Sequence, residues 1–288
     1  MLTLANLIGK KDSSYSGDYG ATTHTGVVRK VNEDTFSAKP EIGLWFIADG
    51  MGGHSSGAVA SRITRDTIDE RIAHREGLTE AIRAAHDDIV KQAQENEVFG
   101  GMGCTVVAVL LDGVEYEVAW VGDSRAYLWD GRLTQITQDH SYVRSLVSRG
   151  AITQEEAKTH PARHLITRCL GINDQEGPLE VEIRRGRFSR GQALLLCSDG
   201  LTDELTDSEI EEVIAVNASA QDRVDSLVES ALDHGGNDNV TAIVLSAPEN
   251  APEPTARRET SAIGTKIELV LGGALLAVFL LGLIFYLR

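Results

Sequence analysis

The sequence of 288 residues contains little cysteine and little proline, with three of the former and six of the latter. The cysteines, Cys104, Cys169 and Cys197, lie far apart and form no Cys-x-x-Cys pair, which argues against a disulfide framework or a cysteine-rich zinc site. We therefore expect buried thiols in a reducing compartment. Scarce proline, 42% hydrophobic residues and 24% charged residues are typical of a globular chain and exclude general disorder.

The chain is also short of positive charge, with 27 Lys and Arg against 43 Asp and Glu and a formal net charge of −16. A nucleic-acid binder needs basic surface to neutralise phosphates, so this composition argues against that class of protein. Residues 247–288 carry four basic and four acidic residues, so the whole excess of negative charge belongs to residues 1–246.

One long uncharged run stands near the end of the sequence. Leu269 to Leu287 comprises 19 residues without a charge. As a helix it would measure about 28 Å, close to the roughly 30 Å of a bilayer's hydrocarbon core. A buried core helix is the alternative, but such a helix shows a polar face and this run has none. We expect a transmembrane helix within residues 266–288.

The remaining sequence divides into an expected domain at residues 1–246 and a linker at 247–265, where three of the six prolines fall. The basic residues Arg257, Arg258 and Lys266 precede the apolar run, and only Arg288 follows it. The positive-inside bias then places the domain on the cytoplasmic side. Residues 1–14 have no long apolar run after basic residues, so we expect no signal peptide there.

Apolar runs and turn residues predict the secondary structure. Buried strands are predicted at 44–48, 104–111, 114–121, 194–197 and 240–245. Asp112-Gly113 and Asp130-Gly131 predict hairpin turns. Helices are predicted at 55–76 and 78–93, after a capping box at Thr206–Glu209, and around 224–231.

Residues 139–178 are predicted to be irregular, with one capping box at Thr153–Glu156. Strands and helices are grouped along the chain and do not alternate. This grouping favours an α+β fold of antiparallel sheets packed with helices over a parallel α/β fold.

Three carboxylates stand at the ends of predicted strands, namely Asp49, Asp199 and Asp238. Clustered carboxylates repel each other unless cations neutralise them. Oxygen ligands without His or Cys partners suit Mg²⁺ or Mn²⁺ and not structural zinc. Each aspartate alone is equally compatible with a turn or a helix cap, but a purely structural explanation of all three requires three coincidences.

Two further motifs place charge near these positions. The run from Arg29 to Asp34 contains adjacent carboxylates, Glu33 and Asp34, which face opposite ways on a strand, so one could bind a metal and the other support it. A solvated turn is the alternative. Asp123, in Gly122-Asp123-Ser124-Arg125, either caps a turn or contributes to a weaker metal site.

Six short motifs then follow one another across the domain: Arg29-x-x-Asn32-Glu33-Asp34, Asp49-Gly50-Met51-Gly52-Gly53, Gly103-Cys104-Thr105, Gly122-Asp123-Ser124-Arg125, Ser198-Asp199-Gly200-Leu201-Thr202-Asp203 and Gly236-Asn237-Asp238-Asn239-Val240-Thr241. Their order resembles the bacterial branch of the metal-dependent protein serine/threonine phosphatases, the PPM or type 2C family. Each motif alone is weak, but six in order from about Tyr19 to Leu245 are specific. The resemblance implies a four-layer αββα sandwich of two antiparallel sheets flanked by helices.

The resemblance also implies roles for single residues. Asp49 would bridge two Mn²⁺ or Mg²⁺ ions, with the Gly50 carbonyl and Glu33 on the side of one ion. Asp199 and Asp238 would hold the other ion. By the same resemblance, Asp34 and Asn239 would support the ligands, and Arg29 would bind phosphate.

A third, weaker metal site of the bacterial members is matched by Asp123 and Asp199, together with Asp203. The segment at about 139–177 matches the flap beside the site. The resemblance thus implies two core ions and a third weaker one.

The implied activity is hydrolysis of phosphoserine and phosphothreonine in proteins by a metal-activated hydroxide. The expected partners are phosphorylated proteins, a Ser/Thr kinase whose action it opposes, and the lipid bilayer. The expected location is the bacterial inner (cytoplasmic) membrane, with a single span and a cytoplasmic catalytic domain. Two alternatives are a catalytically weak adaptor that binds phosphoproteins and a hydrolase of a non-protein phosphate ester.

Two positions depart from the family pattern. Many relatives have a histidine, proposed as the general acid, where this chain has Met51, and methionine cannot donate a proton. His54 is nearby, although a structural role in the glycine-rich turn is the expectation. Cys104 replaces the usual Thr or Ser, in a position expected to be buried without loss of activity. No cysteine begins the Cys-x₅-Arg signature of cysteine-dependent phosphatases.

Overall fold

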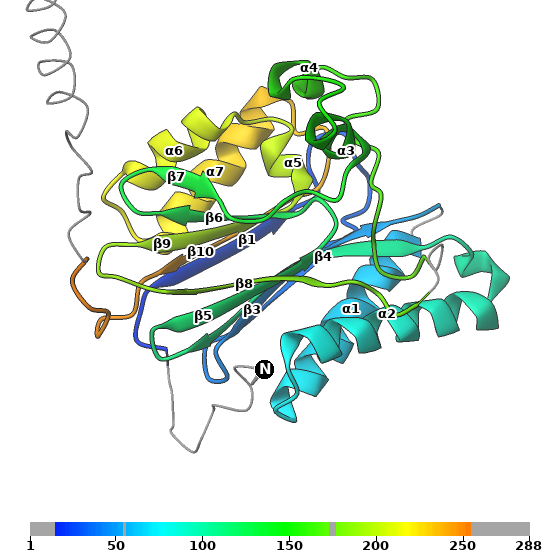
Figure 1. Ribbon diagram of the computed structural model, residues 1–288, viewed down its shortest axis with the longest axis horizontal. Helices are drawn as coiled ribbons and strands as arrows, with labels where there is room; N and C mark the ends of the chain where they lie inside the picture. Colours follow the sequence, from blue (N-terminus) through cyan, green and yellow to red (C-terminus); the bar gives the residue numbers. More distant parts are fainter. Residues whose placement is uncertain (1–14, 54–55, 173–176, 255–288) are drawn as a thin grey trace, which may run out of the picture. The chain divides into compact units, whose positions relative to one another are not determined.

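The computed structural model describes residues 15–53, 56–172 and 177–254. Within them, two five-stranded sheets pack face to face (Figure 1). The first sheet has the order β1-β10-β9-β6-β7, and the second has the order β2-β3-β4-β5-β8. Neighbouring strands are antiparallel throughout both sheets, as the grouping of elements in the sequence predicts.

The strands of the first sheet are β1 (Tyr19–His24), β10 (Val240–Ser246), β9 (Ala193–Cys197), β6 (Arg125–Trp129) and β7 (Leu133–Gln135). Those of the second are β2 (Asp34–Lys39), β3 (Leu44–Met51), β4 (Gly103–Asp112), β5 (Glu115–Val121) and β8 (Glu182–Arg187). The predicted turn at Asp112-Gly113 joins β4 to β5, and the one at Asp130-Gly131 joins β6 to β7.

Helices cover the outer face of each sheet (Figure 1). The second sheet carries α1 (Ser56–Ala73) and α2 (Leu78–Glu95), which are followed by the 3₁₀ turn η2 (Glu97–Phe99). The first sheet carries α5 (Asp199–Thr202), α6 (Asp207–Ala215) and α7 (Ala220–His234). Two short helices, α3 (Tyr142–Ser148) and α4 (Gln154–Lys158), lie in the segment between β7 and β8. The expected four-layer αββα order is confirmed.

The alternation of side chains along a strand explains why two sheets and two helical layers form together. On β4, Val106 and Ala108 pack toward α1 and α2, whereas Val107 and Val109 pack between the sheets. Successive strand residues face opposite sides, so a strand that is apolar at every position is buried on both faces. β9 and β10 divide their apolar residues in the same way between the helical layer and the inter-sheet core.

The domain continues past the expected boundary at residue 246. Ala251 is buried in the inter-sheet core, and the backbone N–H of Arg190 donates to the carbonyl of Pro252 at 2.8 Å. The compact unit therefore extends to Glu253, and the first residues of the expected linker belong to it.

Among the described residues, no helix has the length and apolar character needed to cross a bilayer. The expected span at 266–288 lies outside these residues.

Candidate metal centre

Asp34 and Asp49 face each other at one end of the second sheet. Asp34 begins β2, Asp49 lies near the end of β3, and the register of the two strands pairs them directly. Asp34 is buried, whereas Asp49 is partly exposed. Like charges directly opposite each other destabilise a sheet, so this pair needs hydrogen-bond donors or cations to neutralise it.

Asp34 finds donors on the other sheet. Its Oδ2 accepts hydrogen bonds from the hydroxyl of Ser198 at 2.9 Å and from the hydroxyl of Thr241 at 2.6 Å. Ser198 follows β9 and Thr241 lies in β10, so Asp34 joins the two sheets next to Asp49. Burial raises the pKa of Asp34 to about 7, although both hydroxyls lower it. Its place supports the expectation that Asp34 positions the ligands.

Asp199 reaches the same region from the first sheet. β9 ends at Cys197, and α5 begins at Asp199, so the carboxylate projects from the end of a buried strand. Burial, followed by the carboxylates of Asp123 and Asp203, raises the pKa of Asp199 well above its usual range. Burial, followed by the charges of Asp34 and Asp199, also raises the pKa of Asp49 well above its usual range. These mutual effects show that carboxylates from both sheets form one electrostatic cluster.

Asp238 is the third strand-end aspartate of this cluster. Burial is the main reason why the pKa values of Asp49 and Asp199 are raised, and the charge of Asp238 raises both of them further. It precedes β10 and pairs with Arg29, whose Nη2 lies 2.5 Å from Asp238 Oδ2. Both side chains are partly exposed, at 52% for Arg29 and 36% for Asp238. The structure thus brings the expected phosphate-binding arginine to the carboxylates.

Asn239 holds the loop that carries Arg29 and Glu33. Its Oδ1 accepts a hydrogen bond from the backbone N–H of Glu33 at 2.8 Å. Its Nδ2 donates to the carbonyls of Thr25 at 2.8 Å and Val31 at 3.0 Å. The one hydrogen bond that this buried amide accepts and the two that it donates fix residues 25–33 against β10.

Gly50 sits where the chain has no room for a side chain. Its N–H donates to the carbonyl of Glu33 at 3.2 Å. A Cβ at this position would lie 2.1 Å from the carbonyl oxygen of Gly57 and 2.7 Å from that of Glu33. The glycine therefore lets the start of α1 and the Glu33 loop approach β3 together beside Asp49.

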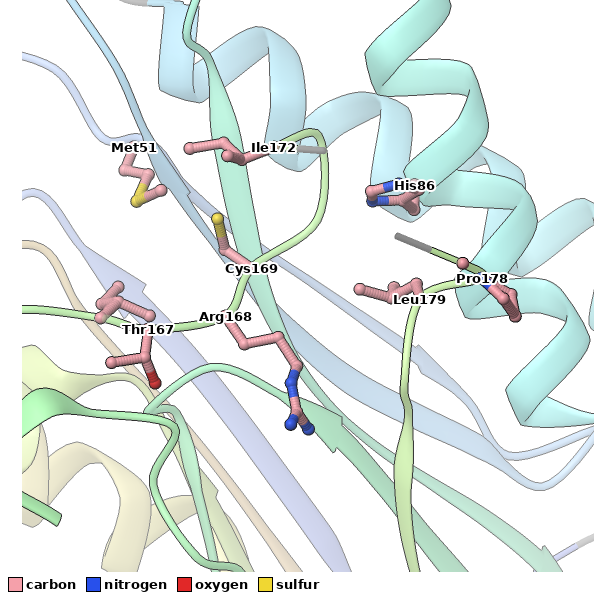
Figure 2. A pocket seen from close by; sticks show the side chains of 10 residues that line it. Met51, His86, Thr167, Arg168, Cys169, Ile172, Pro178 and Leu179 are labelled. Carbon is pink, nitrogen blue, oxygen red and sulfur yellow. The ribbon is translucent and has the colours of Figure 1, made fainter. Parts of the chain in front are cut away.

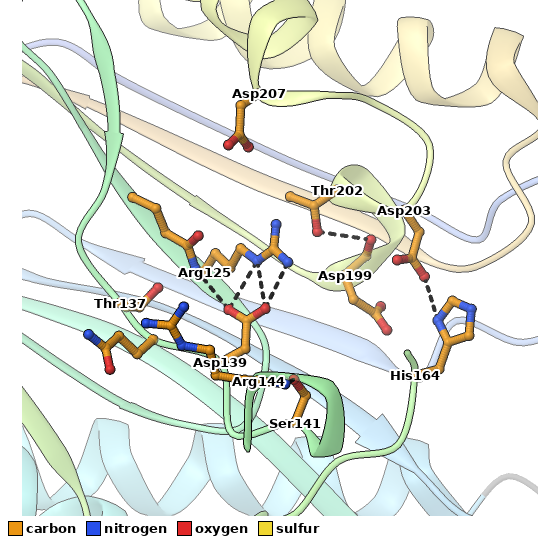
Figure 3. A network of polar contacts seen from close by, with 12 residues as sticks. Arg125, Thr137, Asp139, Ser141, Arg144, His164, Asp199, Thr202, Asp203 and Asp207 are labelled. Carbon is orange, nitrogen blue, oxygen red and sulfur yellow. Dashed lines mark hydrogen bonds and ion pairs between the residues drawn. The ribbon is translucent and has the colours of Figure 1, made fainter. Parts of the chain in front are cut away.

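Asp123 follows β5 and is 8% exposed. Burial, followed by the charge of Asp139, raises its pKa to about 7. Figure 3 shows Asp139 held by Arg125, whose Nε and Nη2 donate to it at 3.0 and 2.7 Å. Asp203, at the end of α5, is exposed and contacts His164, with Nδ1 3.0 Å from Asp203 Oδ2 (Figure 3). The three residues expected at the weaker site therefore surround one region.

A cleft of about 770 Å³ contains Asp123, Asp199 and Asp203 on one side. Its other side comes from the segment that includes α3 and α4, so the expected flap lies beside the carboxylates. This segment contributes the basic side chains of Arg144, Lys158 and Arg163 to the cleft. Basic groups on the outer wall favour an anionic ligand.

Within the described residues, no three His, Cys, Asp or Glu side chains already lie close enough to hold a metal ion by themselves. The carboxylates of the candidate centre come from separate elements, namely β3, α5, the end of β5 and the start of β10. Mg²⁺ usually keeps several waters and needs only one or two carboxylates, so a spread ligand set suits a hydrated ion and not a closed zinc site.

The two departures from the family pattern have different surroundings. Cys104 is fully buried in the core between the second sheet and its helices, as expected. Met51 ends β3 and lines a separate pocket next to α2. His54 lies outside the described residues.

Comparison with known proteins assigns the chain to a family. The model of the family described as "Protein phosphatase 2C" matches residues 24–239. The chain belongs to the protein phosphatase 2C family. The serine/threonine protein phosphatase PstP of Mycobacterium tuberculosis is 40% identical over 233 residues, which is 78% of this chain and 44% of PstP. The serine/threonine phosphatase stp of Listeria monocytogenes is 35% identical over 237 residues, which is 77% of this chain and 93% of stp.

A solved structure of a family member carries metal. The catalytic domain of PstP in complex with two manganese ions is 37% identical, with a TM-score of 0.71, and the match covers 80% of this chain and 98% of that domain. Protein phosphatases 2C use Mn²⁺ or Mg²⁺, which confirms the expected cofactors. The chain spans less than half of the full PstP sequence.

Several residues around these carboxylates were not singled out from the sequence. Ser198 and Thr241 stand inside two of the motifs, but only the structure shows that both bind Asp34. Asp139 and His164 lie in the polar segment between β7 and β8, where nothing in the sequence distinguishes them from other polar residues.

Proposed function

We propose that this chain is a metal-dependent phosphatase that hydrolyses phosphoserine and phosphothreonine in proteins. The observation that carries the proposal is the convergence of Asp49, Asp199 and Asp238 from two sheets next to Arg29. Membership of the protein phosphatase 2C family supports it. The presence of every expected carboxylate favours catalysis over an adaptor role.

Two buried oxygens support a fit between this site and divalent cations. Glu33 Oε1 and Asp123 Oδ1 have no hydrogen-bond partner among the described residues. A buried carboxylate oxygen without a partner is costly, and a cation or its water would satisfy it. We assign the core ions to Asp49, Asp199, Asp238, the Gly50 carbonyl and Glu33, and the weaker ion to Asp123, Asp199 and Asp203.

When bound, the ions supply a water of lowered pKa and neutralise the phosphoryl oxygens. The chain's own residues position the reactants. Arg29 presents a planar guanidinium fork that matches two phosphoryl oxygens. Asn239 holds the loop of Arg29, and Asp34 holds the two sheets together next to Asp49. Met51 has no proton to give, so the leaving oxygen receives its proton from a group other than this side chain.

Release of phosphate from a phosphothreonine peptide tests the proposal. The chain is expected to release phosphate with Mn²⁺ and to stop with EDTA, and Asp199→Asn is expected to lower kcat by a hundredfold or more. Asp130→Asn, in the turn between β6 and β7, is the matched control and should keep full activity. No turnover by the wild type, or full activity of Asp199→Asn, would contradict the proposed function.

We also propose that the chain is anchored in the bacterial cytoplasmic membrane through residues 266–288 and opposes a Ser/Thr kinase there. The support is the uncharged run Leu269–Leu287 with basic residues on its near side. The full chain is expected to sediment with membranes and to resist extraction by carbonate, whereas residues 1–254 are expected in the supernatant. Recovery of the full chain in the supernatant would refute the anchor.

A further inference from the structure

A second pocket, of about 150 Å³, opens at the end of β3 (Figure 2). Its walls come from β3, from α2 and from residues 166–169, 172 and 177–179. The side chains are mainly apolar: Met51, Ile166, Cys169, Ile172, Pro178 and Leu179. An apolar cavity of about 150 Å³ is large enough for a single benzene-sized group.

The pocket is next to the candidate metal centre. Met51 lies two residues beyond Asp49 on β3, so the two side chains leave the same face of the strand about 6.7 Å apart. Gly103, on β4, pairs with Met51 of β3, and a Cβ at Gly103 would lie 2.7 Å from Met51 Cε and 3.2 Å from Cys169 Sγ. The absence of a side chain at Gly103 therefore lets Met51 and Cys169 line one wall together.

Two ionisable side chains, His86 and Arg168, also line the pocket. His86 Nδ1 accepts a hydrogen bond from the N–H of Gly171 at 3.1 Å, and burial lowers the pKa of His86, so its ring is neutral near pH 7. The Arg168 guanidinium is turned toward Glu180, with Nη2 2.9 Å from Oε2. The terminal nitrogen of Arg168 is thus paired with Glu180, whereas its buried Nε has no hydrogen-bond partner among the described residues.

We propose that this pocket receives an apolar side chain of the phosphoprotein substrate, about two positions from the phosphorylated residue. The inference rests on the proposed function and adds a sequence preference to it. An extended peptide advances about 3.3 Å per residue, so about 6.7 Å corresponds to two residues. An apolar cavity of about 150 Å³ accommodates a benzene-sized group, so Leu, Met and Phe fit.

Peptide kinetics test the preference. The substrates are phosphothreonine peptides with Leu, Ala or Asp at positions −2 and +2, and p-nitrophenyl phosphate serves as a substrate without flanking residues. The wild type is expected to show kcat/KM about tenfold higher for Leu than for Ala at one of the two positions, because one apolar side chain is buried. Equal kcat/KM for the Leu and Ala peptides at both positions would overturn the proposal.

A filling variant and a matched control locate the effect. Ile172 lines the pocket, whereas Ile183 lies on β8 away from it, and both are 38% exposed. Ile172→Trp should remove the preference for Leu and leave turnover of the Ala peptide and of p-nitrophenyl phosphate unchanged. Ile183→Trp should keep the preference. A preference that survives Ile172→Trp, or that is lost equally in Ile183→Trp, would overturn the proposal.

A binding measurement separates this inference from the proposed function. Without release of phosphate from any of the phosphothreonine peptides by the wild type, the proposed function fails, and fluorescence anisotropy of labelled Leu and Ala peptides then tests the pocket. Tighter binding of the Leu peptide that Ile172→Trp abolishes supports the pocket. Equal binding of the two peptides overturns it.

Discussion

Arg29 Nη2 lies 2.5 Å from Asp238 Oδ2, so the residue expected to bind phosphate is ion-paired with a residue expected to bind metal. A cation at Asp238 would replace the guanidinium as the neutralising charge and leave Arg29 available for the substrate. Metal binding and phosphate binding are therefore expected to be coupled through this one pair.

Replacing Arg29 with glutamine is expected to have opposite effects on metal and on substrate. Loss of the competing charge should tighten Mn²⁺ binding by up to about fivefold, since a partly exposed ion pair contributes at most about 1 kcal/mol. Loss of the charged hydrogen bonds to phosphate should lower kcat/KM by tenfold to a hundredfold. Calorimetric titration with Mn²⁺ and peptide kinetics measure the two effects. Arg184→Gln, on the exposed edge strand β8, should change neither.

The metal-free protein is expected to lose stability as the pH rises from 5 to 7.5. Burial raises the pKa values of Asp34 and Asp123 to about 7, so the folded state retains protons that the unfolded state releases near pH 4. A carboxyl group whose pKa is raised in the folded state stabilises the protein fully when the pH is below its pKa in the unfolded state. This stabilisation is lost as the pH rises to the folded-state pKa of about 7. Denaturant unfolding in EDTA should show a loss of a few kcal/mol.

Two controls accompany this pH experiment. Mn²⁺ should restore more stability at pH 7.5 than at pH 5, because it binds the ionised carboxylates. Asp123→Asn, which removes one of the titrating groups, should flatten the profile in EDTA. A profile in EDTA that Asp123→Asn leaves unchanged would show that burial does not hold the Asp123 carboxylate protonated.

The parts of the fold that depend on a single strand or on a local turn could be predicted from the sequence. The apolar runs of β4, β9 and β10 have no polar face, which requires a core on both sides, and the helical layers and the second sheet provide it. The capping boxes at Thr153–Glu156 and Thr206–Glu209 both begin helices in the structure. A capping box consists of hydrogen bonds between residues three positions apart, so it can be recognised from the local sequence alone.

Elements that depend on distant partners were not predictable. β8 has the sequence EIRRGR and lacks an apolar pattern, because it is an edge strand whose Arg185 and Arg187 pair with Glu117 and Glu115 of β5. The short helix α3 lies in a segment predicted to be irregular. The contact between Asp34 and Thr241 joins residues 207 positions apart, so only the packing of the two sheets reveals it.

Gly50→Ala is expected to damage both the fold and the metal site. The new Cβ would lie 2.1 Å from the carbonyl oxygen of Gly57, and neither β3 nor the start of α1 can move apart without a loss of packing. The expected cost is about 1–3 kcal/mol of unfolding free energy, together with weaker Mn²⁺ binding because the Glu33 loop shifts. Gly53→Ala is the matched control, since its Cβ would meet nothing within 4 Å. Equal stability of the two variants would contradict the close approach at Gly50.

His140 is expected to weaken the protein as the pH falls below about 6.5. Its Nδ1 accepts a hydrogen bond from the N–H of Gly122 at 3.0 Å, and Nε2 lies 3.0 Å from Glu182 Oε1 and 3.2 Å from Arg168 Nη1. Burial, followed by the charge of Arg168, lowers the pKa of His140, although Glu182 and Asp139 raise it. The ring is therefore neutral in the folded state near pH 7.

The sign of the effect follows from this lowered pKa. The histidine takes up a proton near pH 6.5 in the unfolded state but stays neutral at that pH in the folded state. The free energy of unfolding is therefore highest above pH 6.5 and falls toward pH 5.

His140→Asn keeps an acceptor for Gly122 but cannot titrate, so this variant should be less stable than the wild type at pH 7 and should lose less stability between pH 7 and 5. Denaturant midpoints at both pH values, with Mn²⁺ present, measure the difference. His86→Asn is the comparison, because burial lowers the pKa of His86 as well and gives the same direction. A His140→Asn profile as steep as that of the wild type would assign the acid sensitivity to other groups.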